Sequence, residues 1–203
     1  MNVQSILIGR PLAPTKDKRA IILQAALELI AERGFHGAPM SLVAQRAGVS
    51  AGIIYHYFAS KEELIHALYR QIEADFSRAL LGGGPQLLPL AKAFMQIWLN
   101  AYRFYRSHPH EARFLEQYKH SPFHQVKALP DELLADGDFA FMAQLFAADP
   151  ADRPIKDFPF EVIYELTLGV AARVAYYYAD GRQSISDQLL EQIAAACWQA
   201  IAR

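Results

Sequence analysis

Anion-binding chemistry is the first property suggested by the run AGVSAGIIYHYFASKEEL, from Ala47 to Leu64. Within this run, Lys61 follows Ser60, a residue type that commonly caps the start of a helix. Lys61 is therefore expected in the first turn of a helix, where free backbone amides already attract anions. The position suits a partner that carries phosphate groups.

Metal binding is a second chemistry that the residue types allow. The sequence places His108, His110, His120 and His124 close together, and imidazole groups at such spacings could bind zinc or copper. No cysteine or carboxylate is obviously paired with them. We interpret these histidines as surface and helix-end residues, and we expect neither a metal nor a cofactor.

Enzymatic chemistry finds little support in the sequence. It contains no Ser/His/Asp elbow and no helix-borne metal motif, and the triple glycine at 82–84 lacks the Lys-Ser/Thr of a phosphate loop. We interpret the triple glycine as a linker between helices. We expect a protein that is not an enzyme, with an all-helical enzyme acting on an apolar or aromatic small molecule as the alternative.

A helix-turn-helix is the element predicted to present the run. Met40–Ala47 has its apolar residues at the i, i+3, i+4, i+7 spacing of one helix face. Gly48 follows, where a helix commonly ends in a left-handed residue, and Ser50 can cap the next helix, Ala51–Tyr57. A turn this short, with a glycine in it, is typical of the DNA-reading motif.

The flanks of the second helix support the same interpretation. Ala51 and Gly52 are small enough to let the backbone approach another surface, such as the floor of a major groove. Ser60 and Glu63 form a predicted capping box for the helix that follows. In a DNA-binding motif, Ile54 and Phe58 are expected to pack the second helix on the helix before the motif. The alternative is an ordinary helical hairpin in a bundle, with Ile54, Tyr57 and Phe58 as core residues.

The rest of the chain is predicted to be helical, without strands or internal repeats. Breaks are indicated by glycine, proline and serine clusters. The expected helices cover residues 61–81, 86–106, 109–120, 130–148, 159–179 and 185–202. The fold class is therefore all-α, with a flexible arm at 1–14, a three-helix DNA-binding domain at 15–60 and a larger helical domain at 61–203.

Composition and charge agree with this organisation. Up to Arg70, eight Lys/Arg oppose five Asp/Glu, a net charge of +3, whereas the remainder carries −4. Lys16, Lys18 and Arg19 open the first helix, so the basic end could lie along DNA phosphates. No segment reaches about 18 uninterrupted apolar residues, so no membrane partner is expected. The single Cys197 fits a reducing cytoplasm.

The N-terminal third resembles the DNA-binding domain of the TetR family of transcriptional regulators. TKDKRAIILQAALELIAERGF (15–35) is similar to the first helix of that family, LVAQRAGVS to its second helix and turn, and AGIIYHYFASKEEL to its recognition helix and the start of the fourth. One departure is the pair Ala38-Pro39, where relatives usually place a Thr or Ser that opens the second helix and touches the DNA backbone. Ser41 could partly replace that contact.

The resemblance implies a role for individual residues in binding double-stranded operator DNA. Tyr55 and Lys61 are expected to hold phosphates. The residues expected to face the groove or its walls are Ser41, Ala51, Gly52, Ile53, His56 and Tyr57. The recognition helix lacks Arg, Asn and Gln, which make bidentate bonds to guanine or adenine. Base reading is therefore expected to depend on thymine methyl groups, His56, Ser41, Gln45 and DNA shape.

The family resemblance also implies a small-molecule effector in the larger domain. Aromatic residues recur there at helical spacing. Such a stripe is more often part of an ordinary core, but with the resemblance it favours a cavity for an apolar or aromatic ligand. The expected wall residues are Trp98, Tyr102, Phe114, Gln117, Tyr118, Met142 and Tyr177. Arg173 is expected either to anchor an anionic group or to pair with a carboxylate, such as Glu165 or an acid of a partner chain.

The last two helices are the expected interface of a homodimer. Small residues such as Gly169 allow close helix approach, and the apolar face comprises Leu190, Ile193, Trp198 and Ile201. A dimer would place two recognition helices about one DNA turn, roughly 34–36 Å, or a multiple of it apart. The resemblance thus implies a cytoplasmic, nucleoid-associated regulator, a repressor that its ligand releases from an inverted repeat. An architectural DNA-binding protein without an effector is a further alternative.

Overall fold

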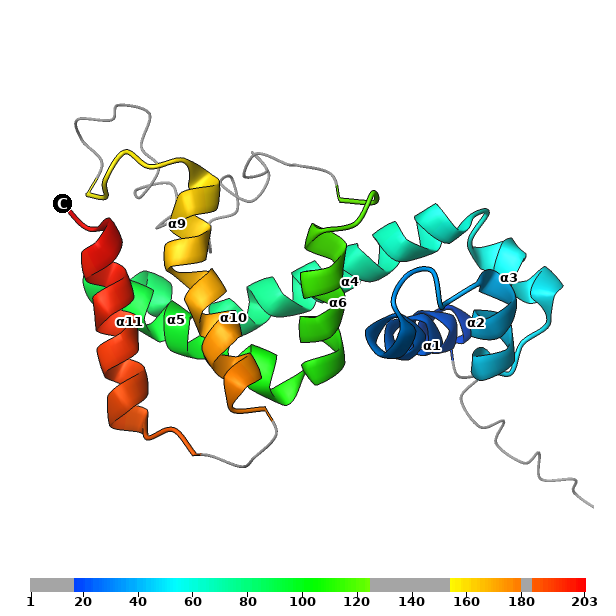
Figure 1. Cartoon of the computed structure of the whole chain (residues 1–203), viewed down its shortest axis with the longest axis horizontal. Helices are drawn as coiled ribbons and strands as arrows, with labels where there is room; N and C mark the ends of the chain where they lie inside the picture. The colour runs from blue at the N-terminus through cyan, green and yellow to red at the C-terminus, as the bar shows by residue number, and fades with distance from the viewer. Residues whose placement is uncertain (1–16, 125–153, 180–183) are drawn as a thin grey trace, which may run out of the picture. The chain divides into compact units, whose positions relative to one another are not determined.

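The computed structural model describes residues 17–124, 154–179 and 184–203, and these are predominantly helical (Figure 1). The all-α prediction is confirmed. The chain divides into two compact units, Met1–Ile65 and His66–Arg203, called here the N-terminal and C-terminal units. The division falls within helix α4 (Lys61–Leu80), shortly after its start.

The N-terminal unit is built from α1 (Lys18–Arg33), α2 (Met40–Ala47), α3 (Ala51–Tyr57) and the first turn of α4. The side chain of Asp17 caps α1 by accepting a hydrogen bond from the Arg19 amide at 3.0 Å. Apolar side chains from all four helices form the core. Those with almost no exposed surface include Ile22, Leu23, Leu29, Ile30, Val43, Ile54, Leu64 and Ile65.

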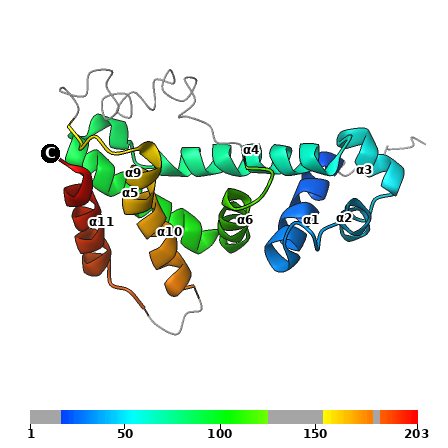
Figure 2. The same cartoon turned by 45° about the horizontal axis from the view of Figure 1, so that its top comes forward.

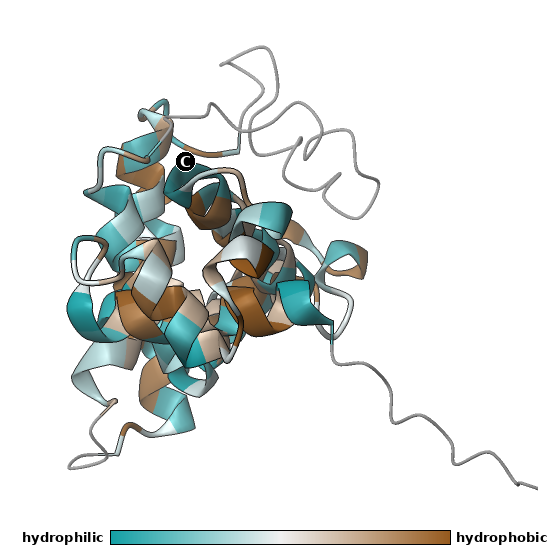
Figure 3. Ribbon diagram, turned by 90° about the vertical axis from the view of Figure 1, so that its right-hand side faces the viewer, coloured by the Kyte–Doolittle hydropathy of each residue, from teal (hydrophilic) through white to brown (hydrophobic). Residues whose placement is uncertain are grey.

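The C-terminal unit is organised around α5 (Leu90–Ser107), whose buried face contains Trp98 and Phe104. Helices α10 (Leu168–Tyr177) and α11 (Asp187–Ile201) pack on α5 (Figures 1 and 2). The short 3-10 helix η1 (Pro85–Leu87), α6 (Pro109–Lys119) and α9 (Phe160–Leu166) complete the described helices. Apolar and polar segments alternate along the ribbons in Figure 3, as expected for amphipathic helices.

The predicted single helix over 159–179 is wrong, because the structure breaks it at Thr167. There the backbone adopts φ −125° and ψ −90°, which ends α9 and precedes α10. The Thr167 hydroxyl donates to the Ile163 carbonyl at 2.6 Å, while the Thr167 carbonyl accepts a bond from the Trp98 indole at 3.1 Å. A tertiary contact with α5 thus accompanies the break, and the nearest glycine, Gly169, lies two residues later, inside α10.

The loop between α4 and α5 is held by a buried asparagine. The Asn100 amide group donates to the carbonyls of Leu80 at 2.9 Å and Gly82 at 2.7 Å. Its oxygen accepts bonds from Gln96 and Arg103. The end of α4 is therefore satisfied by a side chain from α5, which supports the interpretation of the triple glycine as a linker.

Candidate nucleic-acid interface

The turn between α2 and α3 has the predicted helix-turn-helix geometry. Gly48 adopts the left-handed conformation, with φ 66° and ψ 31°. Its amide donates to the Gln45 carbonyl at 3.1 Å, and the Val49 amide donates to the Ala44 carbonyl at 3.0 Å. This pair of bonds is the Schellman motif, which ends one helix sharply and allows another to begin three residues later.

The predicted caps on either side of α3 are also present. The Ser50 hydroxyl accepts a bond from the Ile53 amide at 3.4 Å, and the Ser60 hydroxyl accepts one from the Glu63 amide at 3.1 Å. The Glu63 carboxylate reaches back to the Ala59 amide at 2.7 Å, one residue before the usual capping-box partner. Both helices therefore start at positions that local side chains define.

Helix α2 begins at Met40, as the predicted range Met40–Ala47 requires, and Pro39 occupies its N-cap. The Pro39 carbonyl accepts bonds from the amides of Leu42 and Val43 at 2.9 and 3.1 Å. Proline offers no side-chain cap, so this end of α2 has no side-chain cap bond.

Most of the residues predicted to touch DNA lie on the surface of the N-terminal unit. Those that are exposed are Ser41, Gln45, Ala51, Gly52, Tyr55 and His56, and those that are half-buried are Ile53, Tyr57 and Lys61. The Tyr55 side chain is 55% exposed. Ile54 and Phe58 are buried, which confirms their packing role, and Lys16 lies outside the described residues.

Lys61 makes a contact that the sequence did not indicate. Its ammonium donates a hydrogen bond to the backbone carbonyl of Phe35, and burial lowers the pKa of the group. Another cation, Arg19, has its guanidinium 5.4 Å from the centre of the Phe58 ring. Both cations therefore already have partners inside the unit.

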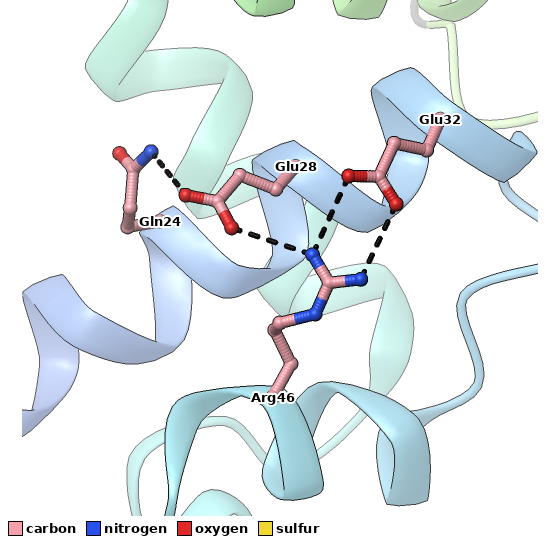
Figure 4. Close-up of polar contacts among 4 residues, drawn as sticks. All are labelled: Gln24, Glu28, Glu32 and Arg46. Carbon is pink, nitrogen blue, oxygen red and sulfur yellow. Dashed lines mark hydrogen bonds and ion pairs between the residues drawn. The ribbon is translucent and has the colours of Figure 1, made fainter.

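Arg46 was not among the predicted site residues, yet it makes the polar contacts between α1 and α2 that Figure 4 shows. Its guanidinium bonds both oxygens of Glu32, at 3.2 and 3.5 Å, and one oxygen of Glu28, at 3.4 Å. The spacing of Glu28 and Glu32, one helical turn apart, was the available signal. Like charges at this spacing repel unless a cation lies between them.

The predicted effector-wall residues have different environments in the C-terminal unit. Trp98, Tyr102, Phe114 and Tyr118 are buried, Gln117 is half-buried, and Tyr177 is 72% exposed. Trp98 stacks on Tyr102, and Phe114 stacks on Tyr118, with ring centres 6.3 and 5.8 Å apart. Met142 lies outside the described residues.

Arg173 is exposed and forms an ion pair with Glu116 at 3.5 Å, whereas Glu165 pairs with Lys119. The carboxylate alternative for Arg173 is thus realised, with a different acid. A pocket of about 310 Å³ lies at another place in the same unit, among α4, α5 and α6. It is lined by Asp75, Arg78, Ala79, Phe104, His108 and Glu111, none of which was a predicted wall residue.

The predicted dimer residues are only partly at the surface. Leu190 and Ile201 are buried in the core of their own chain, whereas Gly169, Ile193 and Trp198 are half-buried. A side chain at Gly169 would meet the Glu165 carboxylate at 2.9 Å. The more exposed apolar side chains of these two helices are Tyr176, Tyr177 and Leu189.

The histidine group does not assemble into a metal site in the part of the chain that the structure describes, where no three His, Cys, Asp or Glu side chains could hold an ion. His108 instead stacks on Phe104 at 4.4 Å, and His124 meets Tyr118 edge-on. No helix among the described residues is long and apolar enough to cross a membrane.

Both units match known protein families. Residues 22–68 match the bacterial regulatory proteins of the tetR family, and residues 89–202, more than half of the chain, match the tetracyclin repressor-like C-terminal domain. The HTH-type transcriptional regulator BetI of Escherichia coli O157:H7 is 28% identical over 170 residues, which cover 68% of this chain and 87% of that protein. BetI of Escherichia coli O139:H28 is 44% identical over 64 residues, 32% of this chain and 33% of that protein.

Solved structures support the same assignment. A putative TetR-family transcriptional regulator from Vibrio parahaemolyticus is 29% identical, with a TM-score of 0.71 over 92% of this chain and 99% of that chain. A TetR-family regulator from Marinobacter aquaeolei VT8 is 22% identical, with a TM-score of 0.74 over 91% of this chain and 95% of that chain. At 22% identity, the likeness to the Marinobacter aquaeolei protein shows the fold alone.

Proposed function

This chain belongs to the TetR family of bacterial DNA-binding transcriptional regulators, and on that premise we propose that it is a repressor which a small effector releases from its operator. The operator is an inverted repeat, bound by a homodimer in the cytoplasm. The family consists of regulators and not of enzymes, so the catalytic alternative is set aside. The alternative of an architectural protein without an effector is addressed by the second experiment below.

The observation that carries operator reading is the α2–Gly48–α3 turn together with the exposed side chains that flank it. Ser41 and Gln45 lie one turn apart on α2, and Tyr55 and His56 are exposed on α3. In this proposal Tyr55, Lys61 and Lys16, which precedes α1 in the sequence, hold phosphates. The residues that face the groove are Ala51, Gly52, Ile53 and Tyr57. Because α3 offers no Arg, Asn or Gln, base contacts are mainly apolar or made by His56, Ser41 and Gln45.

The dimer proposal is supported by apolar side chains that α10 and α11 leave at the surface. Tyr176 is 65% exposed and Leu189 is 41% exposed, and Gly169, Ile193 and Trp198 are half-buried. A second copy that covered this face would remove apolar surface from water. A monomer at micromolar concentration in light scattering would contradict the proposal.

The effector proposal rests on the aromatic residues of the C-terminal unit. Trp98, Tyr102, Phe114 and Tyr118 form two stacked pairs, and such a wall suits an apolar or aromatic molecule. Gln117 could orient the ligand, and Arg173 and Tyr177 lie at the surface, as a rim would. A ligand that binds the free state more tightly than the DNA-bound state must lower operator affinity.

Selection of bound duplexes from a random pool at near-physiological salt tests operator reading. We expect the wild-type chain to enrich an inverted repeat. The matched control is Tyr55→Ala, which removes an exposed side chain and should leave the fold intact. No enrichment by the wild type, with and without a cell extract that supplies small molecules, would contradict the proposal.

Recovery of the effector is the second experiment. The purified protein is denatured, and released small molecules are identified by mass spectrometry and added back to the operator complex. We expect an unchanged apolar or aromatic compound that dissociates the complex. A compound that is chemically altered by the protein would favour an enzyme, and the absence of any compound that affects the complex would favour the architectural alternative.

A further inference from the structure

The helix-turn-helix contains one permanent cation. Between Met40 and Tyr57 the only Lys or Arg is Arg46, in the last turn of α2. In a DNA-binding motif such a residue is ordinarily assigned to a phosphate. Here its guanidinium is turned to α1, where Nη1 and Nη2 bond the two oxygens of Glu32 and Nη1 also bonds Glu28 (Figure 4).

The acidic partners form an arrangement that only a bridging cation makes favourable. Glu28 and Glu32 lie one turn apart on α1, where two carboxylates repel each other. Gln24, one turn earlier, donates to the other oxygen of Glu28 at 2.9 Å and so orients it. The fork of a guanidinium matches a carboxylate in two parallel bonds, which an ammonium cannot do.

The apolar face that packs helix α2 on its neighbours is small. The helix has eight residues, and its buried side chains are Met40, Val43 and Ala44. Its first turn has no side-chain cap, since Pro39 precedes it. A helix of about two turns that packs through so few side chains could rotate about its own axis, and the side chains of Ser41 and Gln45 would then point in another direction.

We propose that Arg46 is a positioning residue, which holds α2 against α1 so that Ser41 and Gln45 face the operator, and that it does not bind phosphate. This inference rests on the operator binding proposed above. It predicts that the Arg46 ion pairs support specific binding and contribute nothing to its salt dependence.

The test compares Arg46→Gln with the wild type on two duplexes, the inverted repeat enriched by selection and an unrelated duplex of equal length. Affinity is measured over a series of salt concentrations, at a temperature where circular dichroism shows both proteins folded. We expect specific affinity to fall by about tenfold, the scale of one lost base contact. Arg33→Gln, at the exposed end of α1, is the matched control and measures the general electrostatic effect of losing one positive charge. Relative to this control, the non-specific affinity and the salt slope of Arg46→Gln should be unchanged.

Two results would overturn the proposal. If Arg46 binds a phosphate, Arg46→Gln lowers the salt slope by about 0.9 per contact and weakens binding to both duplexes. If Arg46 serves only stability, the variant melts at a lower temperature and its folded form binds the operator as tightly as the wild type. Should Arg46→Gln fail to fold, Arg46→Lys replaces it, because it keeps the charge and loses the two-pronged bond.

Substitution of the two acidic partners gives a second test, because positioning and simple electrostatics predict opposite changes in operator affinity. Glu28→Gln combined with Glu32→Gln removes two negative charges from a DNA-binding unit, which on electrostatic grounds alone strengthens binding. Positioning predicts weaker specific binding instead, and no further loss when Arg46→Gln is added. Tighter specific binding by the double variant would overturn the proposal. If the wild-type chain selects no duplex, the operator proposal is overturned and this one with it. If the wild type selects an operator and the variants bind it with unchanged affinity, only this proposal is overturned.

Discussion

The indole N–H of Trp98 donates a hydrogen bond to the backbone carbonyl of Thr167 across 3.1 Å. The two residues are 69 positions apart in the sequence, and Trp98 has no exposed surface. The same carbonyl also accepts the Ala171 amide at 3.2 Å, so it closes the first turn of α10 as well. One tryptophan of α5 is thereby joined to the point where α9 and α10 separate.

Trp98→Phe is expected to lower the free energy of unfolding by about 2 kcal/mol, from the lost hydrogen bond and the space left by a smaller ring. Thr167 keeps one partner, which limits the loss. Urea unfolding followed by far-UV circular dichroism measures the change. Trp198→Phe, at a half-buried position, should cost less than about 1 kcal/mol, and equal losses for the two variants would count against the assignment.

Gly48→Ala is expected to destabilise the N-terminal unit by about 1 kcal/mol, because only glycine adopts φ 66° without a steric penalty. No atom lies within 4 Å of the added Cβ, so the backbone conformation alone accounts for the loss. Gly48→Asn should cost less, since asparagine tolerates this region better. Thermal unfolding of the two variants gives the comparison, and a larger loss for Asn would contradict the explanation.

Tyr55→Phe is expected to weaken operator binding by about three- to tenfold, the scale of one hydrogen bond. The lost group is neutral, so the slope of affinity against salt should not change. Fluorescence anisotropy with the selected duplex at several salt concentrations measures both quantities. Undiminished affinity would remove Tyr55 from the proposed phosphate contacts.

Asn100→Ala is expected to lower the free energy of unfolding by about 2 kcal/mol, because the Leu80 and Gly82 carbonyls lose a shared donor. The Leu80 carbonyl belongs to a buried residue and is the costlier of the two. Gln96→Ala is the matched control, since it removes one bond to the Asn100 oxygen and leaves both capping bonds in place. Chemical denaturation should separate the two variants, and similar losses would argue against a capping role.

Alkaline pH is expected to destabilise the C-terminal unit through Tyr105. Burial raises the pKa of its hydroxyl well above the usual value, and Tyr164 and then Glu116 raise it further. The unfolded chain releases this proton near the ordinary tyrosine pKa of about 10, whereas the folded chain retains it. The contribution of Tyr105 to the free energy of unfolding is therefore fully present below about pH 10 and is lost as the pH rises above that value. Tyr105→Phe should flatten this fall between about pH 10 and 12, and an unchanged profile would contradict the prediction.

Local signals explain why the turn and its caps could be predicted. Gly48, Ser50 and Ser60 act within three residues of themselves, through backbone geometry and amide bonds that the neighbouring sequence already contains. The same is true of the helical periodicity of α2 and α5. For such elements the residue pattern and the physical cause are contained in one short segment.

Distant contacts explain the predictions that failed or were missing. The break at Thr167 involves Trp98, and the bond from Lys61 to Phe35 joins residues 26 apart. The ion pairs of Arg46 bring together residues 14 and 18 apart. No local pattern indicates which charge meets which, because a surface arginine and a bridging arginine look the same in a helix.

By itself the sequence determined the all-helical class, the helix-turn-helix with its left-handed glycine and serine caps, and the buried role of Ile54 and Phe58. These features follow from spacing and local backbone preference. Only the tertiary structure decided which apolar residues of α11 are used internally, as Leu190 and Ile201 are, and that Arg46 faces α1. Burial and ion pairing depend on what the opposite helix presents, which is a property of the packed chain.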